Sequence, residues 1–303
     1  MMNRTEWINA RKKGIGGSDA GAIVGLGKYK TAFDVYADKL SLVPEKEDTE
    51  AMRQGRDLEE YVARRFIEQT GLKVRKSKDF IKNQKYPYAF ANVDRLIIGQ
   101  RAGLECKTAN TLTLKRYKNG EYPEEYYCQC MHYMAVTGYD KWYLAVLILG
   151  KGFEIFTIER DEEEIEALMK AEKSFWENNV LKQIPPLPSG TEQNSSSINN
   201  IYPVANGETI KLLPSADNLL KRRAELRDFI KQAETEKTQI EQEIKLMLGN
   251  NEKAENDTYR VTWKNFERTT FNYQKFFEEN PNIDVSDYME INNYRRLTIK
   301  EAN

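Results

Sequence analysis

Two acids and a lysine form the pattern with the clearest chemical meaning in this chain. Asp94 lies on one expected strand, and Glu105 and Lys107 lie on the next, after a turn over residues 99–103. Because side chains alternate along a strand, Glu105 and Lys107 point to one face and Cys106 to the other. Carboxylate oxygens suit Mg²⁺ or Mn²⁺, and a neighbouring lysine can orient or deprotonate a water that attacks a phosphodiester. The pattern indicates a nuclease site, although an exposed hairpin with a surface salt bridge would carry the same residues.

Charge is distributed unevenly along the chain, although the net charge is only −1. Residues 71–120 carry 12 Lys and Arg against 3 Asp and Glu, whereas residues 121–180 carry 5 against 13. We interpret the basic segment as a face that meets a phosphate backbone, and the acidic segment as a face that meets solvent or a protein partner. A solvated lysine-rich surface would give the same counts.

The composition excludes several classes of protein. Of the 303 residues, 40% are hydrophobic and 31% are charged, which is typical of a soluble globular protein with much surface charge. No apolar run is long enough to span a membrane, and residues 1–13 lack the apolar segment of a signal peptide, so we expect a cytoplasmic protein. Cys106, Cys128 and Cys130 lack the spacing of a zinc knuckle and are expected to be reduced, structural thiols.

Composition and periodicity divide the chain into three zones. Residues 1–184 alternate between helical and strand periodicity, residues 185–209 form a polar linker rich in proline and serine, and residues 210–303 form a helix followed by strands. In the first zone we expect helices over 20–24, 55–70, 124–137 and 161–180, and strands over 73–80, 89–98, 104–108, 142–149 and 153–159. This order predicts a mixed α/β sandwich.

The last zone contains a heptad repeat. One core position is occupied by Leu219, Leu226, Ala233, Ile240 and Met247, and the other by Arg223, Ile230, Lys237 and Ile244. Four heptads predict a long helix that forms a coiled coil or packs against its own chain, and that ends at Gly249. Beyond it, Tyr259, Val261 and Trp263 alternate with polar residues, which predicts a half-buried strand.

Five short segments together resemble the YqaJ-like viral recombinase family, relatives of lambda exonuclease with the PD-(D/E)xK nuclease fold. In chain order they are RKKGIGGSD (11–19), GRDLE (55–59), ANVDR (91–95), LECKT (104–108) and QCMHYMAVTG (129–138). The resemblance spans roughly residues 11–186. It implies an α/β, restriction-endonuclease-like core built on a mixed sheet. The resemblance does not reach the C-terminal helix and β segments, but their apolar residues must pack on something, so we expect this extension to serve assembly or a partner.

The resemblance also implies roles for individual residues. By matching motif, the metal ligands would be Glu59, Asp94 and Glu105, the residue acting on the attacking water would be Lys107, and the residue contacting a phosphate or a ligand water would be Gln129. Two Mg²⁺ or Mn²⁺ ions held by three carboxylates would neutralise charge on the attacking and leaving oxygens. Glu60 stands where the family commonly has a proline, and because helix neighbours diverge by about 100°, only one of the two acids faces the metal. The motif favours Glu59.

The glycine-rich segment 14–19 offers a second candidate site. Glycines let a backbone approach a phosphate closely, and a helix start presents unpaired N–H groups to an anion. With the resemblance, Arg11 and Ser18 would hold a terminal 5′-phosphate. Without it, Ser18 is a helix cap and Gly16-Gly17 a turn. Asp19 is poorly placed beside a phosphate and is expected to cap the helix.

The resemblance implies Mg²⁺-dependent 5′→3′ exonuclease action on double-stranded DNA with free ends, which would prepare single-stranded tails for a strand-annealing protein in phage-type recombination. It also suggests a homo-oligomeric ring, such as a trimer. An endonuclease or a 3′→5′ nuclease of the same fold is one alternative, and a non-catalytic DNA-binding or scaffolding protein acting through its coiled coil is another. Intact Asp94, Glu105 and Lys107 argue against the last. His132, the sole histidine, is expected to be packed rather than catalytic.

Overall fold

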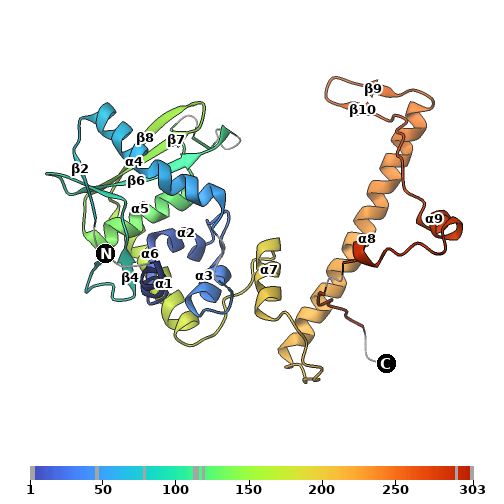
Figure 1. The fold of residues 1–303 in the computed structure, drawn as a ribbon, viewed down its shortest axis with the longest axis horizontal. Coiled ribbons are helices and arrows are strands. Elements are labelled where there is room, and N and C mark those ends of the chain that lie inside the picture. The colour runs from blue at the N-terminus through green and yellow to red at the C-terminus, as the bar shows by residue number, and fades with distance from the viewer. Residues whose placement is uncertain are drawn as a thin grey trace. The chain divides into compact units, whose positions relative to one another are not determined.

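The chain folds into two compact units, Met1–Pro203 and Val204–Asn303 (Figure 1). The computed structural model describes residues 4–44, 48–77, 80–111, 116–117, 120–290 and 293–300. Parts of the basic segment 71–120, and part of the strand expected over 73–80, therefore lie outside the described residues. Within the described ranges, no helix is both long and apolar enough to cross a bilayer.

A five-stranded mixed sheet lies at the centre of the first unit. In spatial order its strands are β2 (Val74–Lys76), β5 (Arg95–Ile97), β6 (Ala102–Ala109), β7 (Lys141–Ile148) and β8 (Gly152–Glu159). Strands β6 and β7 are parallel, and the other neighbouring pairs are antiparallel. Parallel neighbours need a crossover, and helix α5 (Glu124–Thr137) supplies it between β6 and β7. The mixed α/β architecture expected from the sequence is present.

Helices cover both faces of this sheet (Figure 1). On one face, Val62 and Phe66 of helix α4 (Glu50–Thr70) pack with Leu104 of β6. On the other face, helices α5 and α6 (Glu162–Phe175) pack against Trp142 and Leu144 of β7. Because strand side chains alternate, the residues of β6 between those of the α4 face belong to the α5 face. The sheet thus presents the odd-numbered side chains of β6 to α5.

A second, three-stranded sheet ties the N-terminal segment to the chain just before Asp94. Strand β1 (Ile15–Gly16) is parallel to β4 (Ala89–Ala91), which pairs antiparallel with β3 (Ile81–Lys82). The single strand expected over 89–98 is wrong, because β4 belongs to this sheet and β5 to the larger one. Side chains bind the backbone near the short segment between β4 and β5: the Tyr133 hydroxyl donates to the Asn92 carbonyl at 3.0 Å, and the Asp94 carboxylate accepts a backbone N–H from β6.

The described part of the first unit also contains the helices α1 (Arg4–Lys12), α2 (Gly17–Ile23), α3 (Ala32–Lys39) and α7 (Glu192–Ile201), with a π-helical turn, Trp176–Val180, directly after α6. Helix α7 lies within the segment 185–209, for which the sequence suggests only a linker. Its Asn194 donates to the Thr31 hydroxyl at 2.6 Å, and its Ser197 donates to Asp34 at 2.6 Å. The serines and asparagines that resemble a linker composition therefore bind α3.

The second unit contains one long helix, α8 (Ser215–Leu248), which confirms the helix expected from the heptad repeat (Figure 1). Gly249, at a φ of 55°, follows its end. A two-stranded hairpin of β9 (Lys253–Glu255) and β10 (Arg260–Thr262) comes next, then helix α9 (Tyr273–Glu279) and a short 3₁₀ turn, Ser286–Tyr288. The half-buried strand expected around Val261 is wrong in its burial: Tyr259 and Trp263 are exposed, because the hairpin has too few strands to form a core.

Candidate active site

Asp94, Glu105 and Lys107 come together on the α5 face of the sheet. The Lys107 ammonium Nζ lies 2.6 Å from Glu105 Oε1, and the Cys106 N–H donates to Asp94 Oδ2 at 2.8 Å. The Cys106 side chain packs in the apolar cluster on the opposite, α4 face, as strand alternation predicts. Gln129 of α5 donates to Glu105 Oε1 at 2.7 Å. Four of the expected site residues therefore form one contiguous group.

Burial sets the protonation of this group. Burial, with the negative charge of neighbouring Glu105, raises the pKa of Asp94 well above its usual range. Burial would lower the pKa of Lys107, but the attraction of Glu105 outweighs it and the pKa of Lys107 is raised. Lys107 is therefore an ammonium at neutral pH. As an ammonium, Lys107 can donate hydrogen bonds and offset the negative charge of Glu105.

The acids suit a divalent cation. Glu105 is only 3% exposed, and its Oε2 atom is buried without a hydrogen-bond partner in the described structure. A buried carboxylate oxygen without a partner is costly, and a hard cation would satisfy it. Asp94 supplies a second carboxylate at the same place. Across the described ranges, however, no three Asp, Glu, His or Cys side chains lie close enough together to hold a metal ion. The carboxylates of Asp94 and Glu105 fit Mg²⁺ or Mn²⁺. The third expected ligand, Glu59, forms an ion pair with Arg95 instead.

That third residue, Glu59, is held by Arg95. The Arg95 guanidinium is nearly buried and lies 2.5 Å from Glu59 Oε1 and 3.0 Å from Glu60 Oε2. Glu59 is 33% exposed, whereas Glu60 is 70% exposed and also pairs with Lys76 at 3.0 Å. The negative charge of Glu59 contributes to the raised pKa of Asp94, after burial and the charge of Glu105. Glu59 is thus the helix acid on the side of Asp94 and the candidate site.

Arg95 is a site residue to which the sequence analysis gave no role. It also donates to the Asp94 backbone carbonyl at 2.6 Å, so that one guanidinium joins the start of β5 to the acids of α4. Its position beside Asp94 was visible in the sequence. Its partners were not, because the approach of α4 to this edge of the sheet depends on tertiary packing.

Gln129 and Tyr133 connect the acids to the glycine-rich segment. Gln129 is buried and donates to the Tyr133 hydroxyl at 2.8 Å as well as to Glu105. Burial raises the pKa of Tyr133 well above its usual range, so the phenol stays protonated and donates to Asn92. A Cβ at Gly17 would lie 2.5 Å from the Tyr133 ring. Glycine at this position allows the start of α2 to lie directly on that ring.

Arg11 and Ser18 lie together at the surface end of this connection. Arg11 Nη2 donates to Ser18 Oγ at 3.1 Å, and the guanidinium lies over the Trp7 ring, 4.7 Å from its centroid. Ser18 is exposed and is not the helix cap, because α2 begins one residue earlier, after Gly16. Their role in binding a 5′-phosphate stays a prediction.

Asp19 is the third residue of α2, whose N-cap is Gly16, and its carboxylate binds the backbone of that N-cap; Asp19 is also the centre of a buried ion cluster. It accepts from the Gly16 N–H at 3.2 Å and pairs with Lys39 at 2.6 Å and with Lys30 at 2.8 Å. Burial raises the pKa of Asp19, but the charges of Lys30, Lys39 and Arg11 outweigh burial and hold it well below its usual range. Asp19 is therefore ionised, and its ion pairs hold the start of α2 in place.

The remaining residues discussed from the sequence are structural. His132 is fully buried, with Nδ1 2.8 Å from Glu172 Oε1 and Nε2 2.9 Å from the Phe90 carbonyl, which confirms that it is packed. All three cysteines are free, and two of them are buried, as expected for structural thiols.

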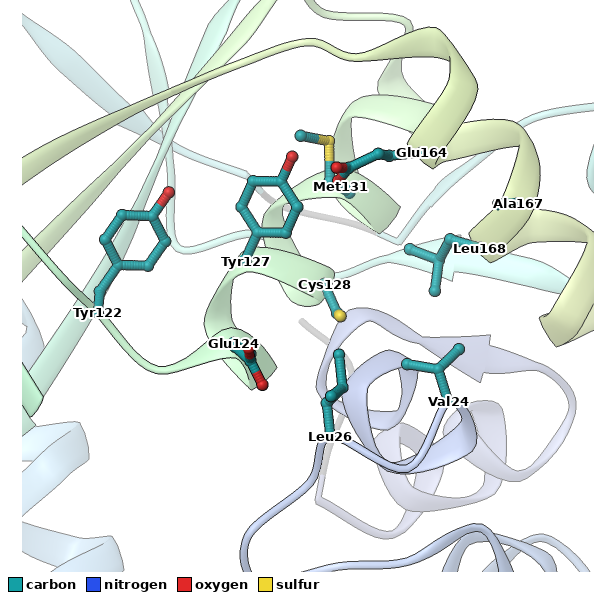
Figure 2. Close-up of a pocket in the computed structure, with 10 residues that line it drawn as sticks. All are labelled: Val24, Leu26, Tyr122, Glu124, Tyr127, Cys128, Met131, Glu164, Ala167 and Leu168. Carbon is teal, nitrogen blue, oxygen red and sulfur yellow. The ribbon is translucent and has the colours of Figure 1, made fainter.

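An apolar pocket of about 510 Å³ lies on the other side of α5 (Figure 2). Tyr127 and Met131 of α5 line it, together with Val24 and Leu168, whereas Gln129 of the same helix faces the acids. Helix α5 thus separates this pocket from the carboxylates, and the pocket has no part in the candidate active site.

Comparisons with known proteins identify the family of this chain and solved structures with a similar fold. Residues 6–140 match the YqaJ-like viral recombinase domain. An uncharacterized protein of Bacillus subtilis (strain 168), YqaJ, is 35% identical over 305 residues, covering 99% of this chain and 95% of that protein. Among solved structures, the alkaline exonuclease LHK-Exo from Laribacter hongkongensis, alone and with dAMP, has a TM-score of 0.51 at 23% identity, covering 59% of this chain and 94% of LHK-Exo. The chain belongs to the YqaJ-like viral recombinase family, and its first unit shares the fold of the alkaline exonuclease.

Proposed function

We propose that this protein is a metal-dependent DNA nuclease, and specifically a 5′→3′ exonuclease that converts duplex ends into single-stranded tails for an annealing partner. The observation that carries the proposal is the buried Glu105 carboxylate, with one oxygen on Lys107 and the other without a partner, beside Asp94. An endonuclease or 3′→5′ nuclease with the same residues is the second candidate.

The chemistry follows from the side chains in the group. A bound divalent ion, held by Asp94 and Glu105, would supply Lewis-acid stabilisation of the phosphodiester and its attacking water. Gln129 fixes the orientation of the Glu105 carboxylate through its hydrogen bond. The Lys107 ammonium lies 4.8 Å from the centroid of the Tyr126 ring, where it orients water and balances the charge of the acids. Glu59 would complete the ligand set after leaving Arg95.

Two observations support DNA ends as the substrate. LHK-Exo, which shares the fold, has been crystallised with the deoxynucleotide dAMP. In this chain, Arg11 and the exposed Ser18 are connected to Glu105 through contacts of Gly17, Tyr133 and Gln129, so the candidate phosphate site and the acids belong to one connected set of residues. A terminal 5′-phosphate held there would position the adjoining phosphodiester for cleavage.

The test is digestion of linear duplexes with 5′-phosphate, 5′-hydroxyl or covalently closed ends, with and without Mg²⁺. We expect Mg²⁺-dependent digestion of open ends and none of closed ends. Arg11→Ala should slow digestion of 5′-phosphorylated ends about tenfold or more, since a charge-assisted hydrogen bond contributes about 1.5–3 kcal/mol, and should leave 5′-hydroxyl ends nearly unchanged.

Lys12→Ala is the matched control, because Lys12 is the neighbouring cation and donates to Ser41. It should digest both kinds of end at the wild-type rate. Cleavage of covalently closed DNA would favour the endonuclease. Equal losses on phosphorylated and hydroxyl ends would make Arg11 a general backbone or structural contact.

A further inference from the structure

Helix α8 exposes its apolar heptad stripe. We call this stripe the seam, and it consists of Leu219, Leu226, Ile230, Ala233, Ile240, Ile244 and Met247. The five large residues Leu219, Leu226, Ile230, Ile240 and Met247 are between 43% and 83% exposed, and only Ile244 is half-buried. A helix of 34 residues is about 51 Å long, so the seam is an extended apolar surface of the kind that marks an interaction site.

Charge is divided between the two halves of α8. Residues 217–231 contain five Lys and Arg against three Asp and Glu, whereas residues 232–248 contain two against four. The positions that border the seam show the same division. Arg222 and Arg227 border its first half, and the acids bordering its second half are Glu234, Glu236, Glu241 and Glu243.

A parallel, in-register pair of α8 helices would place like charges together. In a parallel coiled coil, a residue bordering the seam faces the residue five positions later on the other helix. Arg222 would then face Arg227 of the second copy, and Glu236 would face Glu241. The cations within the core positions would also meet their own equivalents, Arg223 against Arg223. Like charges therefore disfavour the parallel arrangement both at these bordering positions and at Arg223 in the core.

In one register of an antiparallel pair, core cations face apolar residues and bordering arginines face glutamates. In this register the residue numbers of two facing core residues add up to 463. Arg223 therefore faces Ile240, Ile230 faces Ala233, Lys237 faces Leu226 and Ile244 faces Leu219. No core cation meets its own equivalent. In the same register Arg222 faces Glu243 and Arg227 faces Glu234, and the two-fold axis makes each pair occur twice. Opposite charges at these bordering positions set the orientation of a coiled coil.

We propose that α8 is a self-association element that pairs antiparallel with α8 of a second copy of this chain. The helix that packs on the seam is a second α8. The basic first half of one copy lies beside the acidic second half of the other only when the two helices are antiparallel. This inference goes beyond the proposed function, since the pairing uses no residue of the acid group and would join two nuclease units whatever their substrate.

Disulfide trapping in the full-length protein tests the orientation. Leu226→Cys and Lys237→Cys variants are prepared separately, oxidised alone and as a mixture, and the linked peptides are identified by mass spectrometry. In the proposed register, position 226 faces position 237 of the second copy, whereas two copies of position 226 are about 16 Å apart along the axis, too far for a disulfide. We expect 226–237 links in the mixture and no 226–226 or 237–237 links. Links between identical positions, or no link between copies at all, would overturn the proposal.

Charge reversal tests the pairs independently. The double variant Arg222→Glu with Arg227→Glu should weaken self-association at least about tenfold in analytical ultracentrifugation. Adding Glu234→Arg and Glu243→Arg should restore it to within a few-fold of wild type. The matched control, Lys221→Glu with Lys231→Glu, makes the same change of net charge away from the seam and should leave association unchanged. A control as weak as the double variant, or no rescue by the four-residue variant, would contradict antiparallel pairing.

Discussion

Replacing Asp19 by asparagine should destabilise the first unit strongly. Asp19 and Lys39 are both fully buried, 2.6 Å apart, and Lys30 binds the other Asp19 oxygen at 2.8 Å. In Asp19→Asn the buried Lys39 loses the carboxylate that favours its charged form, and burial then lowers its pKa further. Removing one partner of a buried ion pair costs about 3–5 kcal/mol of unfolding free energy. In a unit of this size each kcal/mol lowers Tm by about 2–4 °C, so we expect a loss of about 6–20 °C.

Urea and thermal unfolding followed by circular dichroism would measure this loss. Asp38→Asn is the matched control: Asp38 is 45% exposed and 3.7 Å from Lys30, so its replacement should cost less than about 0.5 kcal/mol. Because the pKa of Asp19 is lowered in the folded state, its contribution is present above its unfolded pKa of about 3.8 and is lost as pH falls below that value. A cost below about 1 kcal/mol for Asp19→Asn at neutral pH would refute the reasoning that this cluster holds the start of α2.

Two further predictions concern single acids and the buried histidine. Glu59→Gln should lower the rate of DNA cleavage far more than Glu60→Gln, because the charge of Glu59 acts on Asp94, whereas Glu60 is 70% exposed and pairs with Lys76; the reverse ranking would show that the other acid joins the metal site. Burial lowers the pKa of His132, but Glu172 outweighs burial and raises it, so their pairing stabilises the fold below the unfolded pKa of about 6.5 and this stability is lost as pH rises through the folded value. Melting curves between about pH 6 and 9 should show this decline in wild type and not in His132→Gln, and equal slopes would contradict the assignment.

Local periodicity was sufficient for the parts of the fold that short-range packing determines. The helix expected over 124–137 and the strand pair around residues 142–159 occur nearly where the sequence places them. The division of residues 89–98 between two sheets was not predictable, because it depends on pairing with other strands: β4 pairs with β1 and β3, whereas β5 pairs with β2 and β6. The helix in the expected linker was missed for the same reason, since its polar residues are bound by α3.

Some residues of the candidate site were likewise predictable from local spacing, and others were not. Asp94, Glu105 and Lys107 were predictable as a group because adjacent strands and a two-residue spacing bring them together. Strand alternation also separated Cys106 from them correctly. The Arg95 clamp on Glu59 joins a strand to a helix 36 positions away, and no local pattern encodes that contact.

The central claim, that Glu105 holds a divalent cation for DNA cleavage, is tested most directly by one comparison. Release of nucleotides from a linear duplex is measured over a range of Mg²⁺ concentrations for wild type, Glu105→Gln and Glu154→Gln. Glu154 is an exposed acid on β8 of the same sheet and controls for the loss of one charge. We predict Mg²⁺-dependent release by wild type and Glu154→Gln, and a loss of about a hundredfold or more in Glu105→Gln with DNA binding retained. Release by Glu105→Gln within a few-fold of wild type, or release by wild type without a divalent cation, would contradict the account.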